Sequence, residues 1–89
     1  MNTGRSLATG TLLNNGTVLV AGGTTGSTNL ETCELYTSPS TWVLTGSMTY
    51  GRSRHTATLL NNGEVLAAGG ENGSFTCEIY DSATAVWTQ

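Results

Sequence analysis

The chain contains one segment twice. Residues Thr11–Gly23 read TLLNNGTVLVAGG and residues Thr58–Gly70 read TLLNNGEVLAAGG, so 11 of the 13 aligned positions are identical. A repeat of this quality within 89 residues indicates two copies of one supersecondary unit. In each copy, two runs of β-compatible residues flank Asn-Asn-Gly, and Asn-Gly accepts the positive φ angles of a tight turn. Each copy therefore predicts a β-hairpin.

The composition supports an all-β fold. The chain is 37% hydrophobic and 10% charged, with 12 glycines and one proline, and much of its polar character comes from Thr, Ser, Gly and Asn. Thr and Val favour strands because their branched side chains are stiff, whereas Gly breaks helices. No amphipathic pattern with the period of a helix extends over a useful length. The sequence therefore predicts short strands joined by tight turns.

The charge of the chain argues against some partners. Arg5, Arg52 and Arg54 are the only basic residues apart from one histidine, and six carboxylates bring the formal net charge to −3. Such a surface cannot neutralise a run of phosphates, so no nucleic-acid partner and no anionic membrane is expected. No apolar segment reaches the roughly 20 residues that span a bilayer. The N-terminus lacks the basic-then-apolar pattern of a signal peptide, and the compartment stays open.

Each copy extends beyond its hairpin to four expected strands. The expected strands of the first copy are Ser6–Leu13, Thr17–Ala21, Glu31–Tyr36 and Thr41–Leu44. The second copy repeats the hairpin 47 residues later and continues with strands at Phe75–Tyr80 and Val86–Thr88. The loop after Gly-Gly is three residues shorter in the second copy, since Gly23 to Cys33 spans 10 positions and Gly70 to Cys77 spans 7. We therefore divide the chain into units 1–46 and 47–89.

The same residue pattern marks both units. An arginine precedes the hairpin, Gly-Gly ends it, Glu-aliphatic-Tyr follows, and a tryptophan comes last. The matching residues are Arg5, Gly22, Gly23, Glu34, Tyr36 and Trp42 in the first unit, and Arg52, Gly69, Gly70, Glu78, Tyr80 and Trp87 in the second. This pattern resembles the kelch repeat, in particular that of galactose-oxidase-like β-propellers. The resemblance implies that each unit is one four-stranded antiparallel blade, with its first strand innermost and its tryptophan strand outermost.

Two blades do not close a propeller. Closed rings have about 4 to 8 blades, and each blade covers its faces only against its neighbours. We therefore expect copies of the chain to complete a ring, with six blades from three chains favoured over eight from four. The expected function is a non-catalytic scaffold or binding module whose loops could engage a protein ligand. The alternatives are a two-blade fragment of a larger copper-radical-oxidase-like kelch enzyme and a sugar-binding propeller.

Three residue sets have expected structural roles. Arg5 and Arg52 should pair with Glu34 or Glu78, because a buried carboxylate without a partner is costly. The Gly-Gly pairs should offer a flat surface to aromatic rings. Cys33 and Cys77 could form a disulfide, but equivalent positions of neighbouring repeats usually lie beyond the roughly 7 Å Cα limit. We therefore favour two free, buried thiols.

No residue set argues for chemistry. His55 and Asp81 are the only histidine and the only aspartate, and the first unit has Ala8 in place of His55, so the histidine should be a structural polar side chain. A metal site of His55, Cys33 and Cys77 has no ligand spacing in its favour. The glycine-rich stretch Gly22–Thr28 lacks the lysine of a phosphate loop. Asn15 and Asn72 match the N-glycosylation pattern weakly, because the turns need Asn-Gly anyway. No enzyme activity, catalytic residue, cofactor or metal is expected.

Overall fold

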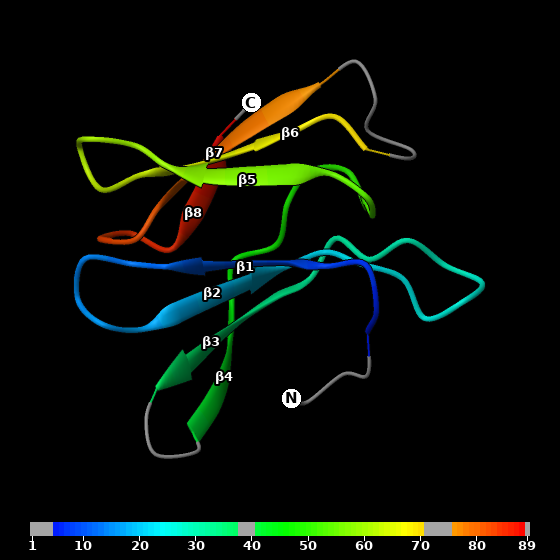
Figure 1. The fold of residues 1–89 in the computed structure, drawn as a ribbon, viewed down its shortest axis with the longest axis horizontal. Helices are drawn as coiled ribbons and strands as arrows, with labels where there is room; N and C mark the ends of the chain where they lie inside the picture. The colour runs from blue at the N-terminus through cyan, green and yellow to red at the C-terminus, as the bar shows by residue number, and fades with distance from the viewer. Residues whose placement is uncertain (1–4, 38–40, 71–75, 89) are drawn as a thin grey trace.

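The computed structural model of the chain describes residues 5–37, 41–70 and 76–88, and these ranges contain eight strands. Their bounds are β1 (Thr9–Leu12), β2 (Val18–Ala21), β3 (Cys33–Thr37), β4 (Thr41–Thr45), β5 (Thr56–Leu59), β6 (Val65–Ala68), β7 (Cys77–Asp81) and β8 (Val86–Thr88). They form two antiparallel sheets in the orders β1-β2-β3-β4 and β5-β6-β7-β8. Figure 1 shows the two sheets as separate layers.

The repeated hairpins have the same register in both sheets. Thr9 pairs with Ala21 in the first sheet, and Thr56 pairs with Ala68 in the second. The turns between their strands contain Gly16 at φ 88° and Gly63 at φ 89°, which is the conformation expected of the glycine in Asn-Gly. The hairpins predicted from the sequence are present in the structure.

Several strand ends differ from those expected. β1 begins at Thr9 instead of Ser6 because Leu7 has a φ of 59°, a left-handed conformation that interrupts an extended strand. Ser6 instead forms an isolated bridge with Thr24. β2 begins one residue later than expected and β4 ends one residue later. β3 and β7 begin at cysteines, two residues after the expected starts, and the expected start at Phe75 lies outside the described residues.

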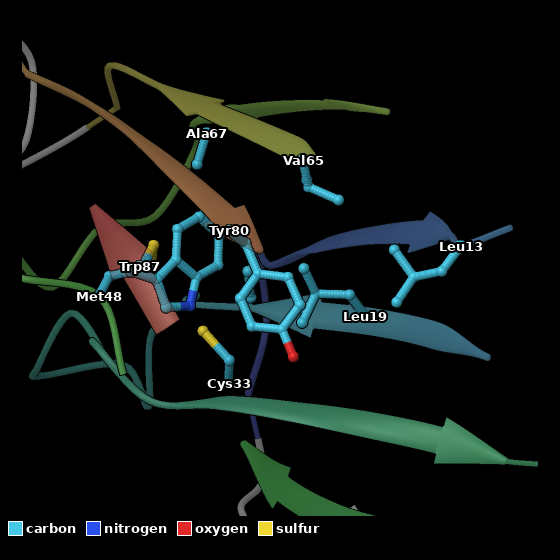
Figure 2. Close-up of a cluster of buried hydrophobic side chains, with 9 residues drawn as sticks. Leu13, Leu19, Cys33, Met48, Val65, Ala67, Tyr80 and Trp87 are labelled. Carbon is cyan, nitrogen blue, oxygen red and sulfur yellow. The ribbon is translucent and has the colours of Figure 1, made fainter. Parts of the chain in front are cut away.

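The two sheets pack through one face each, with β1 beside β5 (Figure 1). We call this contact the blade junction. It is formed by Leu19, Ala21 and Cys33 of the first sheet, by Val65, Ala67, Tyr80 and Trp87 of the second, and by Met48 of the connection. Figure 2 shows Leu19 and Cys33 of the first sheet beside Tyr80 and Trp87 of the second. All of them are at most 8% exposed, so the junction is the hydrophobic core.

Each sheet also has an outer face, which is turned away from the other sheet. Side chains alternate along a strand, so Val18 and Val20 lie on the outer face of the first sheet while Leu19 points into the junction. Leu66 and Ala68 lie on the outer face of the second sheet. They are half-buried, whereas Val65 and Ala67 are fully buried. Within the described residues, the strand at 65–68 therefore packs against another sheet on one face only.

Candidate functional site

Arg5 connects three segments of the first sheet. Its Nη1 donates to the carbonyl oxygens of Gly22 at 2.8 Å and Thr32 at 2.6 Å. Its Nη2 donates to Thr32 Oγ1 and to Glu34 Oε2, each at 3.1 Å. The side chains of Arg5 and Glu34 are 0% exposed, so this ion pair is shielded from solvent.

Arg52 repeats this network in the second sheet. Its Nη1 donates to the carbonyl oxygens of Gly69 at 3.1 Å and Thr76 at 3.0 Å. Its Nη2 donates to Thr76 Oγ1 and to Glu78 Oε2, each at 3.0 Å. The arginine–glutamate pairing expected from the sequence is thus present within each unit. A planar guanidinium with several donors suits this role because it satisfies a carboxylate and two carbonyl groups at once.

Glu78 also reaches the connection between the sheets. Its Oε1 accepts the backbone N–H of Thr49 at 2.7 Å, and its Oε2 accepts that of Tyr50 at 3.1 Å. The carboxylate is 0% exposed and has three donors around it. Hydrogen bonds of this kind compensate the cost of burying a charge. Glu78 therefore fixes the path of the chain from the first sheet into the second.

The nearest neighbours of Gly22, Gly23 and Gly70 are backbone atoms and the side chains of Ala8, Met48 and His55, so the expectation that tyrosine or tryptophan rings pack on the Gly-Gly pairs is wrong. A Cβ on Gly22 would meet the Arg52 carbonyl oxygen at 2.4 Å, and one on Gly70 would meet that of Ser53 at 2.6 Å. All four glycines also have positive φ angles, between 67° and 94°. Gly22 lies against the backbone that begins the next unit, whereas Gly23 and Gly70 lie against the backbone that begins their own unit, at Ser6 and Ser53, so none of the three has room for a side chain. These pairs are close-approach sites for backbone.

The aromatic residues pack against each other instead. Tyr36 and Trp42 have ring centroids 4.8 Å apart, and Tyr80 and Trp87 have centroids 5.1 Å apart, with interplanar angles of 49° and 48°. In the second sheet, the polar groups of Tyr80 and Trp87 both form hydrogen bonds with residues of the first unit. The Tyr80 hydroxyl lies 2.7 Å from Thr45 Oγ1, and Trp87 Nε1 donates to the Gly46 carbonyl at 3.0 Å. The second pair therefore joins the two sheets.

His55 lies at the junction just before β5. Its Nε2 is 2.9 Å from Thr9 Oγ1, and its Nδ1 has no hydrogen-bond partner among the described residues. Burial and the neighbouring Arg52 charge lower the pKa of His55 from 6.5 to about 4. The imidazole is therefore neutral at physiological pH and joins β1 to the second sheet. This contact agrees with the expectation that His55 is a structural polar side chain.

The two cysteines are both free, and they differ in exposure. Cys33 is buried in the junction, and burial raises the pKa of its thiol from 9.0 to about 11. Cys77 is exposed on the outer face of the second sheet. The expectation of two buried thiols is therefore wrong for Cys77, because the layer that covers Cys33 has no counterpart beyond the second sheet.

A pocket of about 650 Å³ lies where the loop after β2 meets the start of the second unit. Most of its lining residues carry hydroxyl groups: Ser6, Thr24, Ser27, Thr28 and Ser53. Asn29 and Arg54 add an amide and a guanidinium. Ser53 Oγ donates to Asn29 Oδ1 at 2.8 Å, which fastens the loop to the second unit.

Three further expectations concern metal binding, membrane insertion and glycosylation. Within residues 5–37, 41–70 and 76–88, no group of three His, Cys, Asp or Glu side chains could hold a metal ion. That same part of the chain has no helix of the length and apolar character that a membrane crossing requires. Asn15 is exposed, and its Oδ1 accepts the N–H and the hydroxyl of Thr17 within the turn. Asn72 lies outside the described residues.

Sequence reasoning missed three features of this region. Met48 is 2% exposed in the junction, but a lone methionine in a connection gives no pattern. Leu7 and Arg54 share left-handed backbone at equivalent positions, with φ of 59° and 56°, although neither is glycine. Leu7 and Arg54 lie 47 positions apart, which is the offset of the repeat, and this equivalence is the signal that could have marked them as a pair. The pocket itself depends on two segments that only the fold brings together.

The comparisons with known proteins support the fold. No protein-family model and no curated protein matches the chain. A solved structure described as a novel fungal alcohol oxidase of the AA5 family, in complex with copper, superposes with a TM-score of 0.85 at 19% sequence identity. The match covers 98% of this chain and 19% of the oxidase chain, so the present chain spans about a fifth of that protein.

At this level of identity the likeness shows the fold alone. It agrees with the galactose-oxidase-like character expected from the repeated motif, although no family model identifies kelch repeats. The chain is all-β, and its two four-stranded antiparallel sheets are consistent with two neighbouring blades of a β-propeller.

Proposed function

We propose that the chain is a non-catalytic kelch-type propeller unit that joins copies of itself into a closed ring and serves as a scaffold or binding module. The observation that carries this proposal is the match between the exposed face of each sheet and the buried face of the other. The outer face of each sheet corresponds, position by position, to the face that the other sheet buries in the blade junction. A copy of the chain can therefore supply the layer that each outer face lacks.

The outer face of the first sheet corresponds to the buried face of the second. Val65, Ala67 and Tyr80 are each 0% exposed in the junction. Their equivalents in the first sheet are Val18, Val20 and Tyr36, all of which are only half-buried. Leu12 shows the same relation, because it is 64% exposed while its equivalent Leu59 packs against the core. Covering this face would bury apolar area at about 25 cal/mol per Å².

The outer face of the second sheet corresponds to the buried face of the first. Cys33 is 0% exposed, whereas its equivalent Cys77 is exposed. Leu19 and Ala21 are each 1% exposed, whereas their equivalents Leu66 and Ala68 are half-buried. The two outer faces are thus complementary to each other and not to themselves. A contact that copies the junction would be head-to-tail, and such contacts form rings when the rotation closes.

Three copies would give six blades and four would give eight, both within the range of closed propellers. We favour three. Light scattering at micromolar concentration should then give about three times the 9.2 kDa chain mass. A stable monomer that unfolds cooperatively would contradict the proposal and favour a two-blade part of a larger propeller. A continuous series of sizes would contradict closure.

A pair of variants tests the head-to-tail direction. Leu12→Arg places a charge on the outer face of the first sheet, and Cys77→Arg places one on the outer face of the second. Each variant alone should stay monomeric, because one of the two complementary faces is blocked in every molecule. An equimolar mixture should form a dimer through the two unblocked faces, but no ring.

Val43→Arg is the matched control. Val43 is also an exposed apolar strand residue, at 51%, but it pairs with Leu35 and so lies on the side of the first sheet that faces the junction. This variant should retain the oligomeric mass of the parent protein in light scattering. Failure of the mixed variants to associate, while the parent protein is oligomeric, would exclude a head-to-tail contact.

A further inference from the structure

Gly10 lies inside β1, at an exposed position on the outer face of the first sheet. A glycine inside a strand weakens the strand, and it commonly marks a bulge or a place where another backbone or a ligand approaches closely. The register from Thr9 to Leu12 is continuous, so β1 has no bulge. Among the described residues, the nearest atom to a Cβ at Gly10 would be Val18 Cγ1, at an ordinary contact distance of 3.9 Å. The described part of the chain therefore has room for a larger residue at this position.

The residue that faces Gly10 across the hairpin is larger than its counterpart in the second sheet. Gly10 pairs with Val20, and the equivalent pair is Ala57 with Ala67. Relative to the alanine pair, the first sheet loses one methyl group at Gly10 and gains two at Val20. The other described strand positions that these two faces share carry identical residues, which are Leu12, Val18, Glu34, Tyr36 and Trp42 in the first sheet and Leu59, Val65, Glu78, Tyr80 and Trp87 in the second. The two substitutions thus lie directly opposite each other and change volume in opposite directions.

The blade junction indicates why such a change would need compensation. Ala67 is 0% exposed and Ala57 packs against the core, so a copy of this contact is filled by the alanine pair. Extra methyl groups in a packed contact are destabilising unless space is made for them. Directly opposite Cβ atoms lie about 4.5 to 5.5 Å apart, so the methyl group that Gly10 lacks leaves space beside Val20. This compensation affects stability only where another layer packs on the face.

We infer that Gly10 and Val20 are a matched pair that determines how the next copy fits on the outer face of the first sheet, an assignment that rests on the proposed head-to-tail contact. The occupant is the outer face of the second sheet of another copy, where Leu66 and Ala68 are half-buried and Cys77 is exposed. β1 lies beside β5 within the chain (Figure 1), so a copied contact sets β1 of one copy beside β5 of the next.

A double-mutant cycle at the two positions tests the pair. Gly10→Ala alone overfills the contact and Val20→Ala alone leaves a void, so each should raise the concentration at which half of the chains are assembled by about tenfold. The double variant recreates the alanine pair of the buried junction, and its midpoint should return to within about threefold of that of the parent chain. Light scattering over a dilution series measures these midpoints.

Val43→Ala is the matched control for Val20→Ala. It removes the same two methyl groups from an exposed strand residue on the side of the first sheet that faces the junction, and it should leave the midpoint of assembly unchanged. If the parent chain assembles, additive losses in the double variant, or midpoints that neither single change moves, would overturn the matched pair. A parent chain that stays monomeric would instead overturn the head-to-tail contact, and the matched pair with it.

The same exchange can be made inside one chain, at a concentration where copies do not associate. Ala67→Val should overfill the blade junction and lower the urea midpoint of unfolding, and adding Ala57→Gly should recover about half of that loss. Recovery would show that these two opposed positions share one space, independently of assembly. A combined variant that is no more stable than Ala67→Val would overturn the compensation on which the matched pair depends.

Discussion

Gly23 donates its backbone N–H to the carbonyl oxygen of Arg52 at 2.8 Å. This hydrogen bond connects the end of one hairpin to the arginine that begins the next unit. The same carbonyl oxygen excludes a side chain at the preceding residue, since a Cβ on Gly22 would clash with it. In the proposed ring, Gly70 of one copy and Arg5 of the next would occupy the equivalent positions.

Two glycines with matched backbone separate steric clash from conformational strain. Gly16 and Gly70 have φ angles of 88° and 87°, but a Cβ on Gly16 would meet nothing within 4 Å, while one on Gly70 would lie 2.6 Å from the Ser53 carbonyl oxygen. Gly16→Ala should therefore cost about 1 kcal/mol of unfolding free energy, and Gly70→Ala more than about 2 kcal/mol. Urea unfolding at one fixed protein concentration measures both. Equal losses would refute the close-approach role.

The buried ion pair of Arg52 should show energetic coupling to Glu78. A double-mutant cycle of Arg52→Met and Glu78→Gln should give a coupling above about 1 kcal/mol, because each single change leaves a buried charge without its partner. The control cycle combines Arg52→Met with Glu34→Gln, which belongs to the other network, and should be additive within about 0.5 kcal/mol. Coupling of similar size in both cycles would contradict pairing within each unit.

His55 should make stability depend on pH. Because its pKa is lowered from 6.5 in the unfolded chain to about 4 in the folded one, the unfolded state binds a proton first as the pH falls. The contribution of His55 is complete above about pH 6.5 and is lost between there and about pH 4, on the order of 2 to 3 kcal/mol.

His55→Ala is the control for this dependence, since Ala8 stands at the equivalent position of the first unit. The free energy of unfolding should fall less between pH 7 and pH 5 in the variant than in the parent chain, because the variant lacks the imidazole. Identical pH profiles would show that the folded histidine titrates normally.

The cysteines should differ in reactivity. Cys33 is 0% exposed and has a thiol pKa of about 11, so alkylation should modify it only after unfolding. Cys77 is exposed in a single chain and should react there, but its alkylation rate should fall as protein concentration rises and copies associate. Mass spectrometry of each cysteine peptide measures the two rates. A Cys77 rate that is independent of concentration, in a protein shown to be oligomeric, would place the contact elsewhere.

Local signals made the hairpins predictable. Asn-Gly determines the turn through backbone conformation alone, so the position and register of β1–β2 and β5–β6 follow from a few adjacent residues. The arginine–glutamate pairs were predictable for a different reason. In a chain with three arginines and no lysine, a buried carboxylate has very few possible partners.

Features that depend on neighbouring layers were not predictable from the sequence. Cys33 and Cys77 share their local sequence, and only the presence or absence of a packed sheet distinguishes buried from exposed. We expected aromatic rings beside the Gly-Gly pairs. The segments that approach these glycines are the starts of the units, which are distant in the sequence and so leave no local signal. The pocket combines residues about 25 to 30 positions apart, as with Ser53 and Thr24 or Asn29, so no local pattern marks it.

The loop between β2 and β3 is three residues longer than its counterpart between β6 and β7. A ring of three copies would therefore have threefold and not sixfold symmetry, even though all six of its blades share one strand pattern. Long and short loops would alternate around one end of the ring. The pocket of about 650 Å³ beside the longer loop would then occur at every second junction. Such a ring would contain three copies of this pocket, one for each chain and not one for each blade.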